Sequence, residues 1–133
     1  MSNENAELIR RAYQAYANGD LAAMLELVDP ELEWTYLDPA LEHPIPQVCH
    51  GRQELEQVLR HWAEHGLRAE LEEVISAGEL VMVGVWTPGV DAHHGRGGDD
   101  RAYSVFTVRG GRIVALRDCR DRQEAFQFAG IQA

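Results

Sequence analysis

The sequence predicts an α+β fold: a curved, mainly antiparallel sheet with three helices from the N-terminal half of the chain and one short C-terminal helix. Two observations support this prediction. Helical hydrophobic periodicity is concentrated in the first half, whereas the second half contains strand-like runs separated by glycine-rich turns. Helices followed by a meander of strands are typical of α+β folds and not of parallel βαβ folds. Three helices folded onto the inner face of such a sheet would enclose a cone-shaped cavity.

Length and composition limit the class of protein. The chain has 133 residues, which fits a single domain over residues 1–133 with a substantial core. Hydrophobic residues make up 45% of the chain, and no apolar run approaches the roughly 20 residues that span a bilayer, so we expect no membrane partner. The N-terminal stretch lacks the pattern of a signal peptide, and we therefore expect a cytoplasmic location.

Charge and reactive residue types exclude several functions. The formal net charge is -10 at pH 7, which argues against the basic surface that nucleic acid phosphates require, so we expect no nucleic acid partner. All 12 basic residues are arginines, which removes lysine Schiff-base chemistry. Cys49 and Cys119 lack a metal-type spacing, and we expect both to be reduced. Acid/base chemistry must use Asp, Glu, His, Tyr or Arg, and no cofactor or metal is expected.

The first half of the chain contains the patterns of two helices, a strand and a third helix. Residues 5–18 place apolar side chains at helical spacing, and Asn18-Gly19 ends that helix. Asp20 is a suitable N-cap for a second helix, which Asp29-Pro30 is expected to end. The elements that follow are a strand at residues 31–37, an irregular proline-rich loop at 38–51 and an amphipathic helix at 52–66.

The second half contains the patterns of four strands and a terminal helix. Hairpin signals occur at residues 76–78 and 109–111, and the polar segment 91–100 is expected to form a longer exposed loop. Asp121 with Glu124 three residues later matches a capping arrangement at the start of a helix, which gives Asp121 a structural role. The strand-like runs are residues 67–78, 79–90, 101–110 and 111–119, and the helix is expected at 122–129.

Three stretches of the chain resemble a known family. They are "YANGDLAAMLELVDPELEW", "HGRQELEQVLRHW" and "FTVRGGRIVALRDCRDRQEAFQFAGI". Together with the order of elements they resemble the nuclear transport factor 2-like superfamily, and within it the SnoaL-like group, which is related to ketosteroid isomerases, polyketide cyclases and limonene epoxide hydrolase. The superfamily includes enzymes, binding proteins and oligomerisation modules, so the resemblance implies a fold and leaves the function to the site.

The resemblance implies roles for two aspartates. The "LRDCRD" at residues 116–121 is similar to a pattern of limonene epoxide hydrolase, which implies a catalytic role for Asp118. The "LDP" at residues 37–39 is similar to the "EDP" of ketosteroid isomerases, which implies that Asp38 shuttles protons. The hydrolase match is incomplete, because Gly84 and Trp86 stand where that enzyme has an arginine and an acid. A partnered structural acid at Asp118 and a turn residue at Asp38 are the alternatives.

Strand alternation assigns the residues around Asp118 to two faces of the sheet. The resemblance places the face of Asp118 inward, under the helices, with Arg120 beside it to modulate its charge. Arg117 then faces outward, on the side where related sheets pair into dimers, and we expect a homodimer through this outer face. Alternation predicts one face with Val114, Leu116, Asp118 and Arg120, and the other with Ile113, Ala115, Arg117, Cys119 and Asp121.

Aromatic side chains and one histidine complete the candidate site. Most of the aromatic residues are expected in the core, and some are expected to line the cavity as an apolar wall for a flat or cyclic small molecule. His43, in the proline-rich loop, is a candidate proton shuttle, with solvent exposure as the alternative. The expected lining residues are Tyr13, Tyr16, Trp34, Tyr36, His43, Trp62, Trp86, Phe106, Leu116 and Arg120.

Three functions remain open from the sequence. The first is binding of a small hydrophobic molecule with acid/base isomerase or cyclase chemistry, in which Asp118 is the principal acid or base and Asp38 the second. The second is a non-catalytic ligand-binding or dimerisation module. The third is an epoxide hydrolase-like enzyme, which requires an arginine and a second acid that converge on one water molecule.

Overall fold

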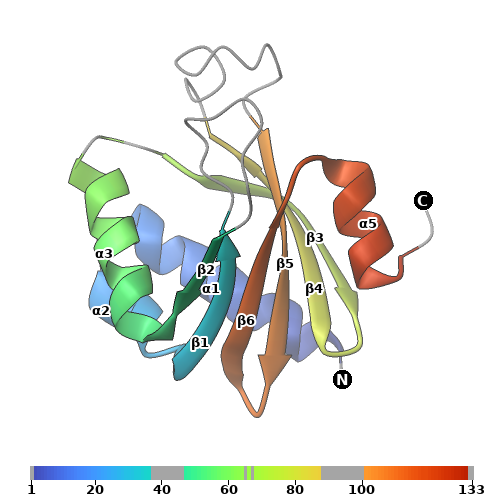
Figure 1. The fold of residues 1–133 in the computed structure, drawn as a ribbon, viewed down its shortest axis with the longest axis horizontal. Coiled ribbons are helices and arrows are strands. Elements are labelled where there is room, and N and C mark those ends of the chain that lie inside the picture. The colour runs from blue at the N-terminus through green and yellow to red at the C-terminus, as the bar shows by residue number, and fades with distance from the viewer. Residues whose placement is uncertain (1, 37–46, 65, 67, 88–100, 132–133) are drawn as a thin grey trace.

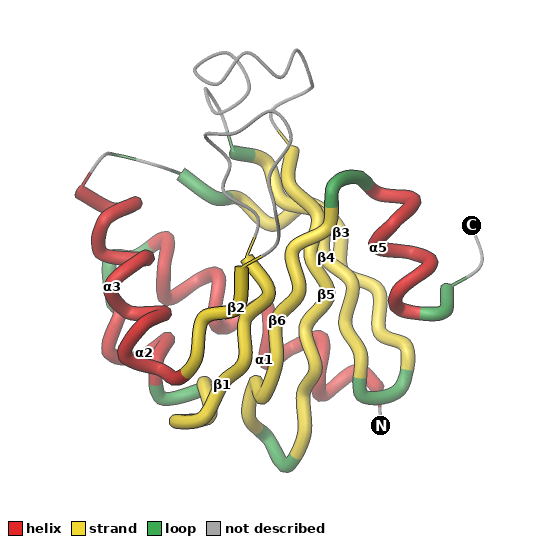
Figure 2. The backbone as a smooth tube through the Cα atoms, in the orientation of Figure 1, coloured by secondary structure: helices red, strands yellow, loops and turns green. Residues whose placement is uncertain are grey.

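The computed structural model shows a curved sheet with helices packed against it (Figures 1 and 2). It describes residues 2–36, 47–64, 66, 68–87 and 101–131. The helices are α1 (Ser2–Ala17), α2 (Leu21–Leu25), α3 (Gly51–Glu64) and α5 (Arg122–Ala129). The strands are β1 (Val28–Tyr36), β2 (Gln47–His50), β3 (Glu70–Ala77), β4 (Leu80–Trp86), β5 (Arg101–Arg109) and β6 (Arg112–Cys119).

The described strands form one six-stranded sheet in the order β2-β1-β6-β5-β4-β3. Four of the strand pairs are antiparallel, and β1 pairs with β6 in parallel. The parallel pair brings the first strand of the chain beside the last one, as Figure 1 shows. These observations confirm the predicted α+β class with a mainly antiparallel, curved sheet, and the four predicted strands of the second half.

The main hydrophobic core lies between α1, α2 and α3 and one face of the sheet, which we call the inner face. Ile9 of α1 and Leu59 of α3 are buried in it together with Val81, Val108 and Ile113 of the sheet. Burial of apolar surface at about 25 cal/mol per Å² is the main force that holds the helices to the strands. The helical spacing of apolar residues in the first half of the sequence is therefore the pattern of this contact.

The C-terminal helix α5 covers part of the opposite, outer face of the sheet (Figure 1). Its Ala125 and Phe126 pack against Met82 of β4 and Val105 of β5. The Asp121 side chain caps the helix, since the backbone N–H of Glu124 donates to Asp121 Oδ1 over 2.8 Å. The structural role predicted for Asp121 is confirmed.

A β-bulge in β6 places one side chain on the face of the sheet opposite to the predicted one. Thr107 pairs with Ala115, and Val108 pairs with Ile113, so that Val114 is an extra residue in the ladder. An extra residue shifts the alternation of side chains by one position. Ile113 consequently turns into the inner-face core and is 2% exposed. The outward position predicted for Ile113 is wrong, because strict alternation along a sequence does not reveal a bulge.

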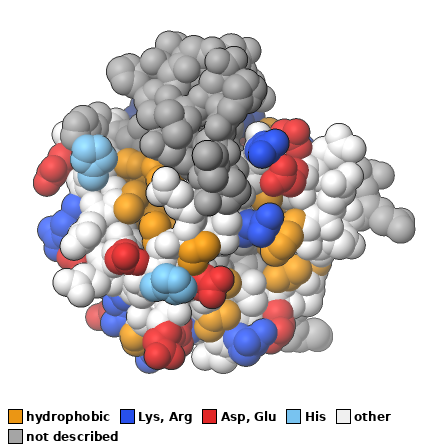
Figure 3. Space-filling model, viewed as in Figure 1, with side chains coloured by type: hydrophobic (Ala, Val, Ile, Leu, Met, Phe, Trp, Pro, Cys, Tyr) orange, Lys and Arg blue, Asp and Glu red, His pale blue; other side chains and the backbone are white. Residues whose placement is uncertain are grey.

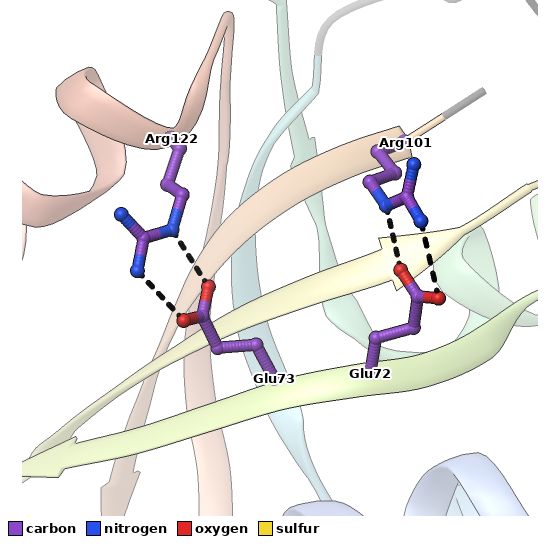
Figure 4. Close-up of polar contacts among 4 residues, drawn as sticks. All are labelled: Glu72, Glu73, Arg101 and Arg122. Atoms are coloured by element: carbon purple, nitrogen blue, oxygen red, sulfur yellow. Dashed lines mark hydrogen bonds and ion pairs between the residues drawn. The ribbon is translucent and has the colours of Figure 1, made fainter. Parts of the chain in front are cut away.

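A second bulge, in β3, points two consecutive glutamates to the same side (Figure 4). Glu73 accepts two hydrogen bonds from Arg122 of α5, at 2.9 and 2.7 Å, and Glu72 pairs with Arg101 of β5 at 2.7 Å. The hydrogen bonds from Arg122 are the main reason that the pKa of Glu73 lies below its usual value. The two ion pairs link the edge strand β3 to α5 and to β5 across the outer face.

Two boundaries differ from the prediction. Val28, expected in the second helix, begins β1, and Pro30 lies inside the strand where a register shift interrupts the pairing with β6. Proline is tolerated at such irregular positions because it has no N–H to donate. Residues 47–50, expected in an irregular loop, form β2, whose pairing with β1 is a tertiary contact that the local sequence does not encode.

Among the described helices, none is long and apolar enough to cross a membrane.

The Asp121 cap generates a stability prediction. Asp121→Ala removes the acceptor for the N–H of Glu124 and is expected to lower the free energy of unfolding by about 1 kcal/mol. Asp121→Asn should keep most of the stability, because asparagine caps helices nearly as well as aspartate. Urea denaturation of the wild-type protein and both variants measures the difference. An equal loss in the two variants would show that the cap is not the source of the stability.

Candidate functional site

Asp118 lies on the inner face of β6 and is bonded from both neighbouring strands. The indole N–H of Trp34 on β1 donates to Asp118 Oδ1 over 3.0 Å, and the hydroxyl of Ser104 on β5 lies 3.4 Å from the same oxygen. Ser104 is the direct cross-strand partner of Asp118. The carboxyl group is half-buried. The sheet therefore holds an acid in a fixed orientation beneath the helices.

Three aromatic side chains lie in contact beside Asp118, and we call Trp34, Tyr36 and Trp62 the aromatic wall. The ring centroids of Trp34 and Tyr36 are 4.9 Å apart, and those of Trp34 and Trp62 are 5.9 Å apart. Both pairs meet edge to face, an arrangement that aromatic quadrupoles favour. Trp34 is 2% exposed, whereas Tyr36 and Trp62 are half-buried. The wall thus has a buried base and two partly accessible rings.

Tyr13 of α1 lies close enough to Asp118 for the charge of that acid to act on its phenol. Burial, and to a smaller extent the negative charge of Asp118, raise the pKa of the Tyr13 phenol well above its usual value. Its ring packs edge-on against Phe106 of β5 with centroids 6.1 Å apart. Burial also raises the pKa of Tyr16, about one helical turn further along α1. Tyr13 therefore remains a neutral hydrogen-bond donor at physiological pH.

The structure brings most of the predicted lining residues to the inner face. Phe106 is buried there, and Leu116 packs against the same core from β6. Asp38 and His43 lie outside the described residues. The predicted residues that the inner-face core and its edge bring together are Tyr13, Tyr16, Trp34, Tyr36, Trp62, Phe106 and Leu116.

Trp86 is a correction to the predicted set. Alternation along β4 gives it the face of Met82, which packs under α5 on the outer side of the sheet. The guanidinium of Arg68 lies 6.0 Å from the Trp86 ring centroid. Gly84 shares this outer face, and a Cβ atom there would lie 3.2 Å from Cε1 of Tyr103. The region matched to the hydrolase's arginine and acid is thus turned away from Asp118.

Arg120 is a second correction. β6 ends at Cys119, and Arg120 lies exposed in the bend that leads to α5. The alternation that placed it inward applies only within a strand, so it does not extend to this residue. An exposed Arg120 at this position gives no support to the expectation that its guanidinium modulates the charge of Asp118.

Sequence reasoning missed two residues of this site. No local sequence pattern marks Ser104 as a site residue. The register of the β5–β6 hairpin places its hydroxyl opposite Asp118, so knowledge of that register would have identified it. Cys49 of β2 pairs with Trp34, and its pKa is raised by burial and then by the charges of Glu54 and Asp118. A raised pKa keeps a thiol protonated and poorly nucleophilic.

The other chemistry available at the site is limited. Cys119 packs on the outer face of the sheet, and burial, more than any neighbouring charge, raises its pKa to about 12, which leaves that thiol unreactive. Within the part of the chain that the structure describes, no group of three or more His, Cys, Asp and Glu side chains could hold a metal ion. The arrangement offers one positioned carboxylate, a neutral phenol and an aromatic wall, groups that can take part in proton transfer.

Comparison with known proteins agrees with this architecture. The family model described as a SnoaL-like domain matches residues 9–116, and the chain belongs to this family. A search of the curated proteins gives no match.

Solved structures of similar fold include proteins without an assigned function and candidate enzymes. A nuclear transport factor 2-like protein of unknown function from Mesorhizobium loti is 27% identical with a TM-score of 0.67, over 88% of this chain and 90% of that one. Another, from Burkholderia pseudomallei, is 25% identical with a TM-score of 0.65, over 93% and 95%. IdmH of Streptomyces antibioticus, named as a candidate polyketide cyclase, is 20% identical with a TM-score of 0.65, over 96% and 99%. The last likeness concerns the fold alone.

The coupling of Tyr13 to Asp118 generates a prediction for the alkaline titration. Asp118→Asn removes a negative charge that opposes ionisation of the phenol, so the pKa of Tyr13 should fall, while burial keeps it above its usual value. Phenolate absorbance across alkaline pH measures this, and Tyr13→Phe identifies the contribution of that ring. Asp121→Asn is the matched control and should leave the titration unchanged. An unaltered Tyr13 titration in Asp118→Asn would contradict the proximity of the two groups.

Proposed function

We propose that this protein binds a small, hydrophobic cyclic molecule at the aromatic wall and catalyses an isomerisation or cyclisation with Asp118 as the principal acid or base. The observation that carries the proposal is the half-buried Asp118 carboxyl group, which accepts a hydrogen bond from Trp34 beside the accessible rings of Tyr36 and Trp62. Apolar rings with few fixed polar groups are the usual composition of small-molecule sites.

The proposed chemistry uses the residues in distinct roles. The Asp118 carboxylate removes a proton from a carbon next to a substrate carbonyl, and the electron pair of the broken C–H bond moves to the carbonyl oxygen. The Tyr13 phenol, which stays protonated, donates a hydrogen bond to that oxygen as it gains negative charge. In an isomerisation Asp118 then returns the proton to another carbon. In a cyclisation the enolate carbon forms a bond to a second carbonyl carbon, the π electron pair of that carbonyl moves to its oxygen, and this oxygen takes the proton from Asp118. Neither route requires a cofactor.

Two further residues belong to this proposal although they lie outside the described part of the chain. Asp38 would serve as the second acid or base, and His43 as a proton shuttle, because a histidine titrates near neutral pH. The solved neighbour IdmH is named as a candidate polyketide cyclase, a name that supports the same class of reaction here. The epoxide hydrolase alternative loses support, because Arg120 is exposed beyond the end of β6.

We also propose that the protein forms a homodimer through the outer face of the sheet, as one cytoplasmic domain over residues 1–133. α5 covers the part of this face formed by Met82 and Val105, which leaves β1, β2 and β6 for a second copy. Val48 of β2 is 51% exposed, and the pairing register puts it in one cross-sheet row with Thr35 and Arg117. Figure 3 shows hydrophobic side chains among charged ones on the side of the molecule that Figure 1 shows.

Exchange of substrate protons for deuterium tests the proposed catalysis without knowledge of the natural substrate. β-Tetralone is a flat bicyclic ketone with acidic C–H bonds, and NMR follows the loss of those protons in deuterated buffer. The wild-type protein is expected to accelerate the exchange, and Asp118→Asn to lower that acceleration by about a hundredfold or more, since an acid/base group contributes at least this much.

Two controls make the exchange experiment decisive. Asp121→Asn changes the neighbouring aspartate of the same segment and should retain the wild-type rate. Binding of β-tetralone without any acceleration would contradict the catalytic assignment and favour a non-catalytic binding module. Wild-type acceleration that persists in Asp118→Asn would show that another group is the base.

A further inference from the structure

We propose that the molecule bound at the aromatic wall carries a positively charged nitrogen on or next to its ring, so that the ligand is a cyclic organic ammonium ion. This inference rests on the proposed binding of a cyclic molecule at the same site and adds the charge of that molecule. Three features of the inner face carry it: the orientation of the rings, the position of the carboxylate and the sign of the local field.

The rings of the aromatic wall present faces in different directions. Trp34 is inclined by 68° to Tyr36 and by 88° to Trp62, so the three side chains form a corner instead of a flat stack. The ring faces of aromatic side chains attract cations within about 6 Å, most strongly for tryptophan and at desolvated positions. Tyr36 and Trp62 are half-buried, which leaves part of each side chain accessible to a ligand.

Asp118 lies at the edge of this corner because Trp34 holds it there. The indole that packs against both other rings donates its N–H to Asp118 Oδ1 over 3.0 Å. Ser104 lies on the other side of the same oxygen, at 3.4 Å. Hydrogen bonds donated to a carboxylate favour its ionised form. An ammonium group beside the wall would then gain a charge-assisted hydrogen bond, which is roughly twice as strong as a neutral one.

The electrostatic potential around the aromatic wall is negative, which favours a cationic ligand. Burial is the main cause of the raised pKa values of Tyr13 on α1 and Cys49 on β2, and the negative charge of Asp118 raises both further. Glu54 of α3 acts on Cys49 in the same direction. The whole chain carries a formal net charge of -10. A surface of this sign attracts cations and repels anions during association.

A ligand series with one ring system and three charges tests the inference. α-Naphthylmethylamine is a cation at neutral pH, α-naphthylmethanol is neutral and α-naphthoate is an anion, while the flat ring is the same in all three. The indole N–H signals of the three tryptophans in an NMR titration report the site. We expect the amine to bind about tenfold more tightly than the alcohol, which corresponds to about 1.4 kcal/mol, and the anion to bind least.

The position of binding is checked within the same spectra and with matched variants. Signals of Trp34 and Trp62 should shift, whereas that of Trp86 on the outer face should not. Asp118→Asn should reduce the affinity for the amine to that for the alcohol. Trp62→Leu should weaken the binding of both, and Trp86→Leu, the same substitution on the other face, should change neither.

The outcomes separate this inference from the proposed function. If the alcohol binds as tightly as the amine, or if Asp118→Asn keeps the preference for the amine, the ammonium ligand is overturned while binding of a cyclic molecule stands. If none of the three compounds shifts the signals of Trp34 and Trp62, both the inference and the proposed binding at the aromatic wall are overturned.

Discussion

The hydrogen bond between the Trp34 indole and the Asp118 carboxyl group is the interaction on which the rest of the candidate site depends. It joins β1 to β6, the parallel pair of the sheet, across 84 positions of sequence. A buried indole N–H requires an acceptor, and a half-buried carboxyl group requires donors, so each group meets a need of the other. Loss of one partner leaves the other unsatisfied, which typically costs about 1–3 kcal/mol. Trp34 therefore belongs to the apolar core through its ring and to the polar centre of the site through its N–H.

The two faces of the sheet divide structural and chemical tasks. On the outer face, charged side chains have evident structural partners: Arg122 binds Glu73 and Asp121 caps α5. On the inner face, Asp118 accepts hydrogen bonds from Trp34 and Ser104, and its charge acts on the Tyr13 phenol. Two aspartates only three positions apart thus differ in role because one lies within β6 and the other just before a helix. Asp118 also has structural partners in Trp34 and Ser104, but it differs from Asp121 in being half-buried beside aromatic rings.

Local patterns predicted much of this architecture. The four strands of the second half and the cap at Asp121 follow from alternation and capping signals within a few residues, whereas the inward face of Asp118 followed from the family resemblance. The features that the sequence did not reveal are non-local. Ile113 changes face because of a bulge, and β2 exists because β1 pairs with it. The bond from Trp34 to Asp118 depends on a parallel register that no local pattern encodes. Arg120 and Trp86 were misplaced, one beyond a strand end and one by parity.

Hydrogen exchange of the Trp34 indole proton, followed by NMR in the wild-type protein and in Asp118→Ala, measures whether this hydrogen bond protects the buried indole. Burial slows exchange in both proteins, but only the wild type has the acceptor at 3.0 Å. We expect much faster exchange at Trp34 in the variant, with a large change in its chemical shift and no change at Trp86. Equal exchange rates and an unchanged Trp34 signal in the two proteins would contradict this expectation.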